Sequence, residues 1–289
     1  MRSVLSFVLI VMMVFLAVAY FTMLDRKVLG YGQFRKGPFK VSLWGVVQPL
    51  LDGVKLFLKS FVVTSNMSFL EVSLGASLVL SSMVLSWFYI SSYLGCYDLL
   101  SGLVVVMILS GVSVIGVFMV GLFSASVYSV VGVLRSVAQM VSYEVVMGLI
   151  LIMVFQMSGS INKMGGFSVF MGVMIVFILG LTVVMEVNRT PVDFLEGESE
   201  LVSGGVTELG GLLFALMFLA EYGFMAFYSV LVSVVLTGGL SVWLVIGCVY
   251  MFSWLRLSLP RFRYDLLMLF SWKILMPVVM LMLIIVWCV

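Results

Sequence analysis

Long apolar runs separated by short polar breaks dominate this chain from one end to the other. A membrane-spanning helix needs roughly 20 apolar residues, because each residue adds about 1.5 Å to a helix and the hydrocarbon core is about 30 Å thick. The pattern therefore predicts an all-α polytopic membrane protein with eight transmembrane helices in one domain covering residues 1–289. These helices are expected near residues 4–24, 69–94, 99–123, 136–157, 167–187, 209–236, 239–256 and 266–289.

Composition supports this fold class. Of the 289 residues, 64% are hydrophobic and only 10% are charged, whereas a soluble domain is about half apolar and a quarter charged. The net charge of +2 is small and scattered, so binding to nucleic acid through its phosphates is not expected. Partners are expected in the bilayer and beside it, membrane lipids included.

The usual catalytic and metal-binding residue sets are missing from the sequence. The chain has no histidine, which removes Ser-His-Asp and Cys-His catalysis. Its cysteines, Cys96, Cys248 and Cys288, are far apart and form no Cys-x-x-Cys pair, so no disulfide framework and no zinc or iron–sulfur site is indicated. We expect no catalytic residue, no metal and no cofactor bound by this chain alone.

The basic residues orient the predicted helices. With eight spans both termini lie on one side, and every Lys and Arg except Arg2 and Lys163 falls on or near the side of the odd-numbered connections. Basic loops stay on the cytoplasmic side of a membrane, or on the matrix side in a mitochondrion. The two long inner loops are expected at residues 25–66 and 188–208.

The first inner loop contains a predicted amphipathic helix. Apolar and polar side chains recur there at three- and four-residue steps on different faces, which is typical of a helix lying in the headgroup plane with its apolar side down. A helix half-buried against the bundle is the alternative. The apolar face holds Leu43, Val47, Leu50, Val54, Phe57 and Phe61, and the polar face holds Gln48, Asp52, Lys55 and Lys59.

Three carboxylates lie within or near predicted spans: Glu144, Glu186 and Glu221. An ionisable group inside a membrane costs ~2.5 to 3.5 kcal/mol on insertion scales, so each of them needs a reason. For Glu144 and Glu221 no basic residue lies within one helical turn, which favours a proton-carrying or polar-channel role over an ion pair that fixes packing. For Glu186, three residues from Arg189, the two interpretations are equally consistent.

The second inner loop is densely acidic. Six carboxylates and one arginine lie within 23 residues, and the like charges should titrate as a coupled set. An acidic loop that is merely solvated is the alternative, but the glycines near residues 204–211 favour a structured, re-entrant loop. The charged residues of this stretch are Glu186, Arg189, Asp193, Glu196, Glu198, Glu200 and Glu208.

Several of these segments resemble the subunit 1 family of respiratory complex I, the proton-pumping NADH:quinone oxidoreductase. The similarity begins at Asp25-Arg-Lys-Val-Leu-Gly-Tyr-Gly, continues at Gln48-Pro and through Asp52-Gly-Val-Lys, and returns at Leu134-Arg-Ser-Val-Ala-Gln. Its most specific stretch is Glu186-Val-Asn-Arg-Thr-Pro-Val-Asp-Phe-Leu-Glu-Gly-Glu-Ser-Glu, followed by Ala220-Glu-Tyr, Trp254-Leu-Arg and Pro260-Arg-Phe-Arg. These blocks follow the family order along the whole chain. Asp25 departs from it, since the family commonly has Glu there.

The resemblance implies a membrane subunit that forms much of the ubiquinone chamber, beside the peripheral arm, and begins an acidic path toward the pumping subunits. NADH, FMN and iron–sulfur clusters would belong to partner subunits of the membrane and peripheral arms. Glu144, Glu186 and Glu221 would form the proton path. The quinone-chamber residues would be Arg26, Arg35, Asp52, Arg189, Asp193, Glu196, Glu198, Glu200 and Glu208.

Two rival functions stay open from the sequence. The heel subunit of a membrane-bound hydrogenase or formate-type complex is the nearest in mechanism, and a stand-alone cation/proton antiporter also carries buried carboxylates on a helical bundle. A receptor or purely structural subunit would leave Glu221 and the acidic loop unexplained. The abundance of Val, Phe, Met and Gly with few Pro favours a mitochondrially encoded chain, and hence the mitochondrial inner membrane with the main loops in the matrix.

Overall fold

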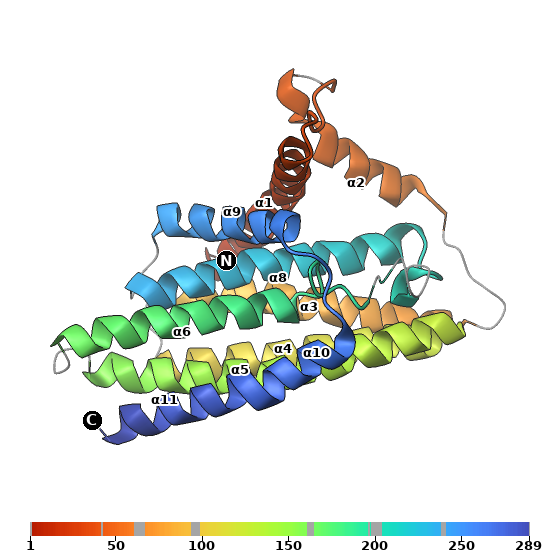
Figure 1. Cartoon of the computed structure of the whole chain (residues 1–289). Helices are drawn as coiled ribbons and strands as arrows, with labels where there is room; N and C mark the ends of the chain where they lie inside the picture. Colours follow the sequence, from red (N-terminus) through yellow and green to blue (C-terminus); the bar gives the residue numbers. More distant parts are fainter. Residues whose placement is uncertain are drawn as a thin grey trace.

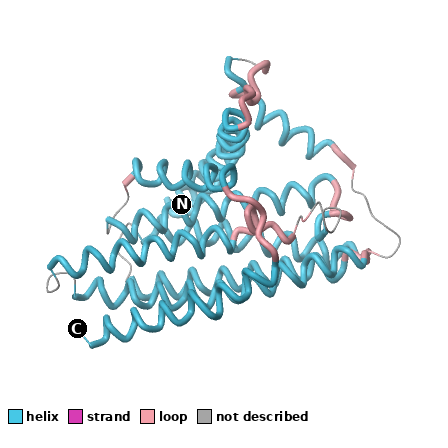
Figure 2. Tube along the Cα trace, viewed as in Figure 1, coloured by secondary structure: helices cyan, strands magenta, loops and turns pink. Residues whose placement is uncertain are grey.

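The architecture is a bundle of long helices with two further helices standing off it (Figure 1). The structure is a computed structural model that describes residues 2–41, 43–60, 67–93, 99–160, 165–195, 197, 204–237 and 241–288. Within these residues there are helices and loops and no strand (Figure 2). The bundle consists of α3 (Phe69–Tyr93), α4 (Leu99–Phe123), α5 (Val127–Ser160), α6 (Gly165–Glu186), α8 (Gly211–Thr237), α9 (Val242–Ser258) and a last helix in three parts.

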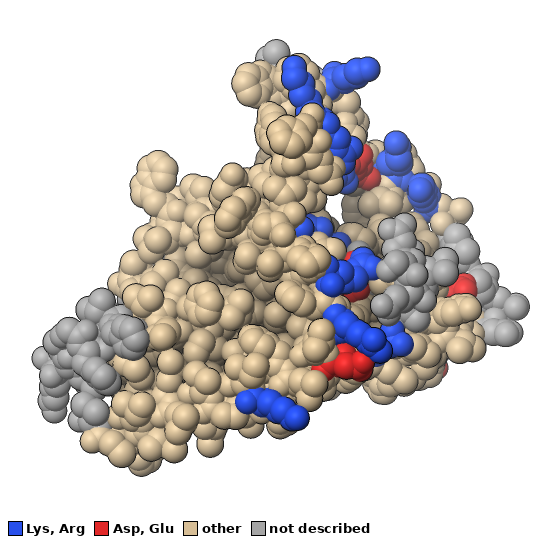
Figure 3. Space-filling view, viewed as in Figure 1, with Lys and Arg blue, Asp and Glu red and all other residues tan. Residues whose placement is uncertain are grey.

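The all-α membrane fold class is confirmed. Among the described residues six helices are long and apolar enough to cross a membrane, and shorter apolar helices lie at Met171–Glu186 and Val242–Ser258. Lys and Arg gather over α1, α2 and the loops at one end of the visible face, while the described surface toward the other end is almost entirely uncharged (Figure 3). Such a separation is typical of a protein whose apolar part lies in lipid.

Helix α1 (Arg2–Gly32) continues well past the predicted end at residue 24. The sequence prediction that the inner loop begins at residue 25 is therefore wrong. Asp25 is only 1% exposed and forms an ion pair with Arg256 of α9. Because this carboxylate has its partner inside the protein, the helix does not have to end where the apolar run ends.

Helix α5 begins at Val127, earlier than the predicted residue 136. The Ser126 hydroxyl accepts a hydrogen bond from the Ser129 N–H at 3.3 Å, which is the usual way for serine to satisfy a free N–H at a helix start. The polar residues near Arg135 concealed this start in the sequence pattern. As a result, Glu144 lies near the middle of a 34-residue helix.

The last span is not one regular helix, as the predicted range 266–289 implied. It consists of α10 (Tyr264–Leu269), the π-helical segment η4 (Phe270–Leu275) and α11 (Met276–Cys288). Pro277 explains the irregularity, because proline has no N–H to donate and its ring clashes with the carbonyl four residues earlier, that of Lys273. Widening to a π-helix relieves this clash, and the Met276 N–H donates to the Ser271 carbonyl instead.

Helix α2 (Gln48–Leu58) is the amphipathic helix expected in the first inner loop, and it follows the short helix η1 (Leu43–Gly45). It stands off the bundle (Figure 1), and none of its residues is buried. Leu50, Val54 and Phe57 are 45–60% exposed. This arrangement favours a helix whose apolar side faces the bilayer over one half-buried against the bundle.

Helices α3 and α4 pack closely enough that their backbones touch. A Cβ added at Gly116 would lie 2.9 Å from the Gly75 carbonyl oxygen, and one added at Gly75 would lie 2.8 Å from the Gly116 carbonyl oxygen. Small residues permit such close approach between helices in membranes. This glycine pair therefore sets the spacing between α3 and α4, the helix that carries Ser110.

We expect Gly116→Val to destabilise the protein by about 1 to 3 kcal/mol, the usual penalty for overpacking. Gly172→Val, at a position where an added Cβ meets nothing within 4 Å, is the matched control. Thermal inactivation of the membrane-bound protein measures both. Equal inactivation temperatures for the two variants would contradict the close packing of α3 on α4.

Candidate functional site

The segment after α6 is built into the protein. Asn188 takes a left-handed conformation with φ of 53°, as residues that end helices often do, and turns the chain away from the helix axis. All residues from Val187 to Leu195 are buried except Thr190, which is half-buried. The Phe262 N–H donates to the Pro191 carbonyl at 3.0 Å. The described part of the acidic loop is therefore a packed structure and not a solvated one.

Arg189 and Glu221 form a buried ion pair at the start of this loop. Arg189 Nη2 donates to Glu221 Oε2 at 2.5 Å, with side-chain exposures of 6% and 11%. The guanidinium also lies 4.4 Å from the ring centre of Phe218 and 4.7 Å from that of Tyr222, so aromatic faces of α8 hold it in place. A loop residue and the mid-membrane carboxylate of α8 are thus directly joined.

Arg256 of α9 forms a second buried connection beside the first. Its guanidinium pairs with Asp25 of α1, donates to the Thr190 hydroxyl at 3.1 Å and lies 3.4 Å from the Tyr222 hydroxyl. One side chain therefore links α1, the loop, α8 and α9. A planar guanidinium with five donors suits this multiple role better than a lysine would.

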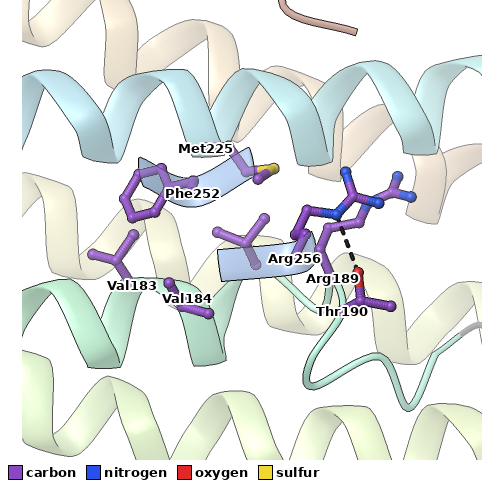
Figure 4. Close-up of a pocket in the computed structure, with 8 residues that line it drawn as sticks. Val183, Val184, Arg189, Thr190, Met225, Phe252 and Arg256 are labelled. Carbon is purple, nitrogen blue, oxygen red and sulfur yellow. Dashed lines mark hydrogen bonds between the residues drawn. The ribbon is translucent and has the colours of Figure 1, made fainter. Parts of the chain in front are cut away.

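Both arginines line a small pocket between α6, α8 and α9 (Figure 4). Their side chains lie next to each other at one end of it, while Val183, Val184 and Phe252 close the other end. Because each arginine is paired with a carboxylate, the charged end of the pocket is close to neutral overall.

Asp193 has its own partner farther along the loop. Arg261 Nη2 donates to Asp193 Oδ2 at 3.0 Å, and the aspartate side chain is 7% exposed. Arg261 belongs to the connection between α9 and α10. Together with the Phe262 to Pro191 bond, this ion pair fastens the acidic loop to that connection.

Two further carboxylates are held by hydroxyl groups between helices. Ser110 of α4 donates to Glu144 of α5 at 2.7 Å, and Tyr228 of α8 donates to Glu186 at 2.8 Å. The Gln139 side chain donates to the Met185 carbonyl next to Glu186. The three predicted proton-path residues therefore lie on α5, at the end of α6 and on α8, and each has a polar contact from a neighbouring element.

The predicted chamber residues on α1 and α2 also meet. Arg26 Nη1 donates to Asp52 Oδ2 at 2.5 Å, and Gln48 donates to Asp52 Oδ1 at 3.0 Å, so this ion pair joins the end of α1 to α2. Arg35 donates to Gln33 at 2.9 Å and is exposed. The surface is hollowed between α2 and the bundle, with basic side chains at its border (Figure 3).

The remaining predicted site residues are less informative. Glu208 is half-buried in the turn between η3 (Gly204–Val206) and α8. Glu196, Glu198 and Glu200 lie outside the described residues. The expected crowding of the acidic loop is therefore a prediction still, and the described half of that loop is dominated by ion pairs with arginines.

Comparison with known proteins identifies the family. A model of a family described as NADH dehydrogenase matches residues 5–287. The chain belongs to this NADH dehydrogenase family. It is 41% identical over 284 residues to NADH-ubiquinone oxidoreductase chain 1 of Heterololigo bleekeri, with 92% of this chain and 90% of the relative covered. It is 39% identical to the Aedes aegypti protein of that name, covering 95% and 92% of the two chains.

A bacterial member of the NADH dehydrogenase family is similar as well. A membrane subunit of the NADH-quinone oxidoreductase of Magnetococcus marinus is 35% identical over 300 residues, covering 96% of this chain and 88% of the relative. The resemblance to subunit 1 of complex I, first drawn from the charged loops, is confirmed. Relatives named for ubiquinone and for quinone both span nearly the whole chain.

The sequence analysis of this NADH dehydrogenase family member missed the residues that neutralise its acidic site. Arg256 and Arg261 counted only as basic residues of the inner side, and Asp25 only as a departure from the family pattern. Tyr228 and Ser110 were not considered. No sequence signal connects them to their partners, because 231 residues separate Arg256 from Asp25 and 42 separate Tyr228 from Glu186.

Proposed function

We propose that this chain is the quinone-chamber membrane subunit of a proton-pumping NADH:ubiquinone oxidoreductase in the mitochondrial inner membrane. Two relatives bear the name NADH-ubiquinone oxidoreductase chain 1, which supports ubiquinone as the substrate of the complex. Flavin and iron–sulfur clusters would be held by partner subunits in the peripheral arm. The basic end of the molecule, with the long loops, would face the matrix.

The observation that carries this proposal is the Arg189–Glu221 pair. It joins a loop that the family resemblance puts beside the quinone to a carboxylate inside the membrane-spanning α8. A charge change at the loop can therefore act on the transmembrane region through one ion pair. The hollow beneath α2, bordered by basic side chains, is where the quinone would enter.

The chain's own residues would couple the reaction to the membrane electrostatically. Quinone reduction consumes two electrons, supplied by partner subunits, and two protons. Negative charge that develops near Arg189 competes with Glu221 for the guanidinium, and Glu221 then gains affinity for a proton. In a low-dielectric interior such an effect extends to neighbouring carboxylates. Glu186 and Glu144, held by Tyr228 and Ser110, would be the next members of the path.

A carboxylate variant tests the proton path directly. Glu144→Gln keeps the hydrogen bond from Ser110 within reach but cannot carry a proton, so we expect fewer protons pumped per electron while quinone reduction continues. Glu71→Gln, at the first turn of α3, is the matched control and should leave the ratio unchanged. Sealed vesicles with a pH-sensitive dye measure the ratio. Full pumping per electron in Glu144→Gln would contradict the path.

The size and activity of the native particle test the wider proposal. In mild detergent the 32.0 kDa chain should migrate with a particle many times larger, and that particle should oxidise NADH with a quinone in an inhibitor-sensitive manner. An antiporter would instead run alone or as a small oligomer and move cations after reconstitution. That second outcome would remove the quinone assignments.

A further inference from the structure

The outer face of the last span carries a single charged residue, Lys273. No other Asp, Glu, Lys or Arg occurs from Leu266 to Val289. Lys273 is exposed, between Trp272 at 51% and Ile274 at 53% exposure. In the described part of the chain no carboxylate lies within ion-pair distance of it. A lysine on a face turned toward the bilayer needs a compensating group.

Lys273 lies too deep for an easy escape to water. Asp265, which is exposed and paired with Arg263 at 2.9 Å, marks the aqueous end of the span. Lys273 follows eight residues later, about 12 Å along the helix, and Trp287 lies about 21 Å beyond it. A lysine side chain is shorter than 12 Å, so snorkelling alone does not bring its ammonium to the level of Asp265.

The other face of this span is fully engaged, which prevents the helix from turning Lys273 inward. Leu267, Ser271, Leu275 and Val279 are all buried at regular four-residue steps. Tyr143 of α5 donates to the Leu267 carbonyl at 3.0 Å, and Ser142 of α5 lies 3.5 Å from the Met268 sulfur. These contacts fix the rotation of the helix, and with it the outward direction of residues 272–274.

The π-helical segment adds a second polar group at the same place. Pro277 has no N–H with which to bond the Lys273 carbonyl, as a regular helix would require. The backbone oxygen and the ammonium of one residue are thus both available on the outward side. π-Helical segments in α-helices are frequently found at functional sites.

We propose that the face around Lys273 is the docking site for a membrane helix of a partner subunit that presents a carboxylate to the Lys273 ammonium. This inference rests on the proposed function, since it requires that the chain be part of a larger membrane assembly. The exposed neighbours Trp272, Ile274 and Leu281 would pack against that helix, and the ion pair would set its depth. The partner's carboxylate would be desolvated by the same contact and would depend on Lys273 for its charge.

Cross-linking in the intact assembly tests the partner's nature. A photoreactive amino acid in place of Ile274 should give one dominant adduct with a membrane-embedded subunit. The same amino acid at Leu50 of α2, which is exposed on the other side of the molecule, should not give that adduct. Adducts with phospholipid only would overturn the proposal and assign Lys273 to a lipid phosphate.

Variants of Lys273 test the charge. Lys273→Met should release the cross-linked subunit several-fold more readily in detergent, while Lys273→Arg should retain it, because arginine preserves the cation. Retention equal to the parent in Lys273→Met would overturn the proposal. If the chain belonged to a different assembly, the adduct would still form but the particle would lack NADH:quinone activity, which separates failure of this proposal from failure of the proposed function.

Discussion

Replacing Arg189 with methionine is expected to prevent normal accumulation of the protein. The substitution leaves the Glu221 carboxylate, whose side chain is 11% exposed, without the cation that compensates it. Removing one partner of a buried ion pair typically costs about 3 to 5 kcal/mol. Since whole domains are stable by only about 5 to 15 kcal/mol, the amount of chain in the membrane fraction and its thermal stability should both fall strongly.

The double variant Arg189→Met with Glu221→Met separates charge from packing. If the loss comes from the uncompensated carboxylate, the double variant should recover much of the stability, because an apolar pair can replace a buried ion pair at little cost. It should still fail to pump normally, since the link between the loop and α8 is gone. A single Arg189→Met variant as abundant and as heat-resistant as the parent would show that the pair contributes nothing.

Replacing Arg256 with methionine is the second change with a large expected effect. It leaves Asp25, which is 1% exposed, without its cation and removes the hydrogen bond to Thr190. We expect a loss of about 3 kcal/mol or more for the broken buried pair, together with weaker packing of α1 against α9. The thermal midpoint of the purified particle and its quinone reductase activity measure the two effects.

Arg256→Lys is the matched control for this position. It keeps the positive charge but loses the planar fork that reaches Asp25 and Thr190 at once, so its stability should lie between those of the parent and Arg256→Met. Arg263→Met, at an exposed pair with Asp265 whose side chains are 78% and 64% exposed, should change stability by less than about 1 kcal/mol. If Arg256→Met behaves like Arg263→Met, Arg256 does not hold α1 in place.

The ion pairs show where prediction from sequence stops. Glu221 and Glu144 were expected to act without a nearby base, because only neighbours within one helical turn can be seen in a sequence. In the folded chain Glu221 meets Arg189, 32 residues away, and Glu144 meets the Ser110 hydroxyl, 34 residues away. The residue types in the site were therefore predictable, and their partners were not.

Helix boundaries show the same limit. The range 99–123 coincides with α4 (Leu99–Phe123), because an uninterrupted apolar run between polar breaks needs no tertiary information. The end of α1 and the start of α5 were misplaced, since both helices continue through charged residues. The π-helical segment follows from Pro277 in hindsight, but proline alone permits a kink, a break or a π-helix.

The sequence by itself determined that this chain is an all-α membrane protein, which end carries the basic loops, and which family it resembles. These properties depend on composition, on apolar run length and on local motifs, all of which are readable without a fold. Only the tertiary structure decided which carboxylate meets which cation, that the acidic loop is packed where it is described, and that Lys273 faces outward. Those outcomes depend on how distant helices pack, because a charge inside a membrane is stabilised by whatever group the fold brings within a few ångströms of it.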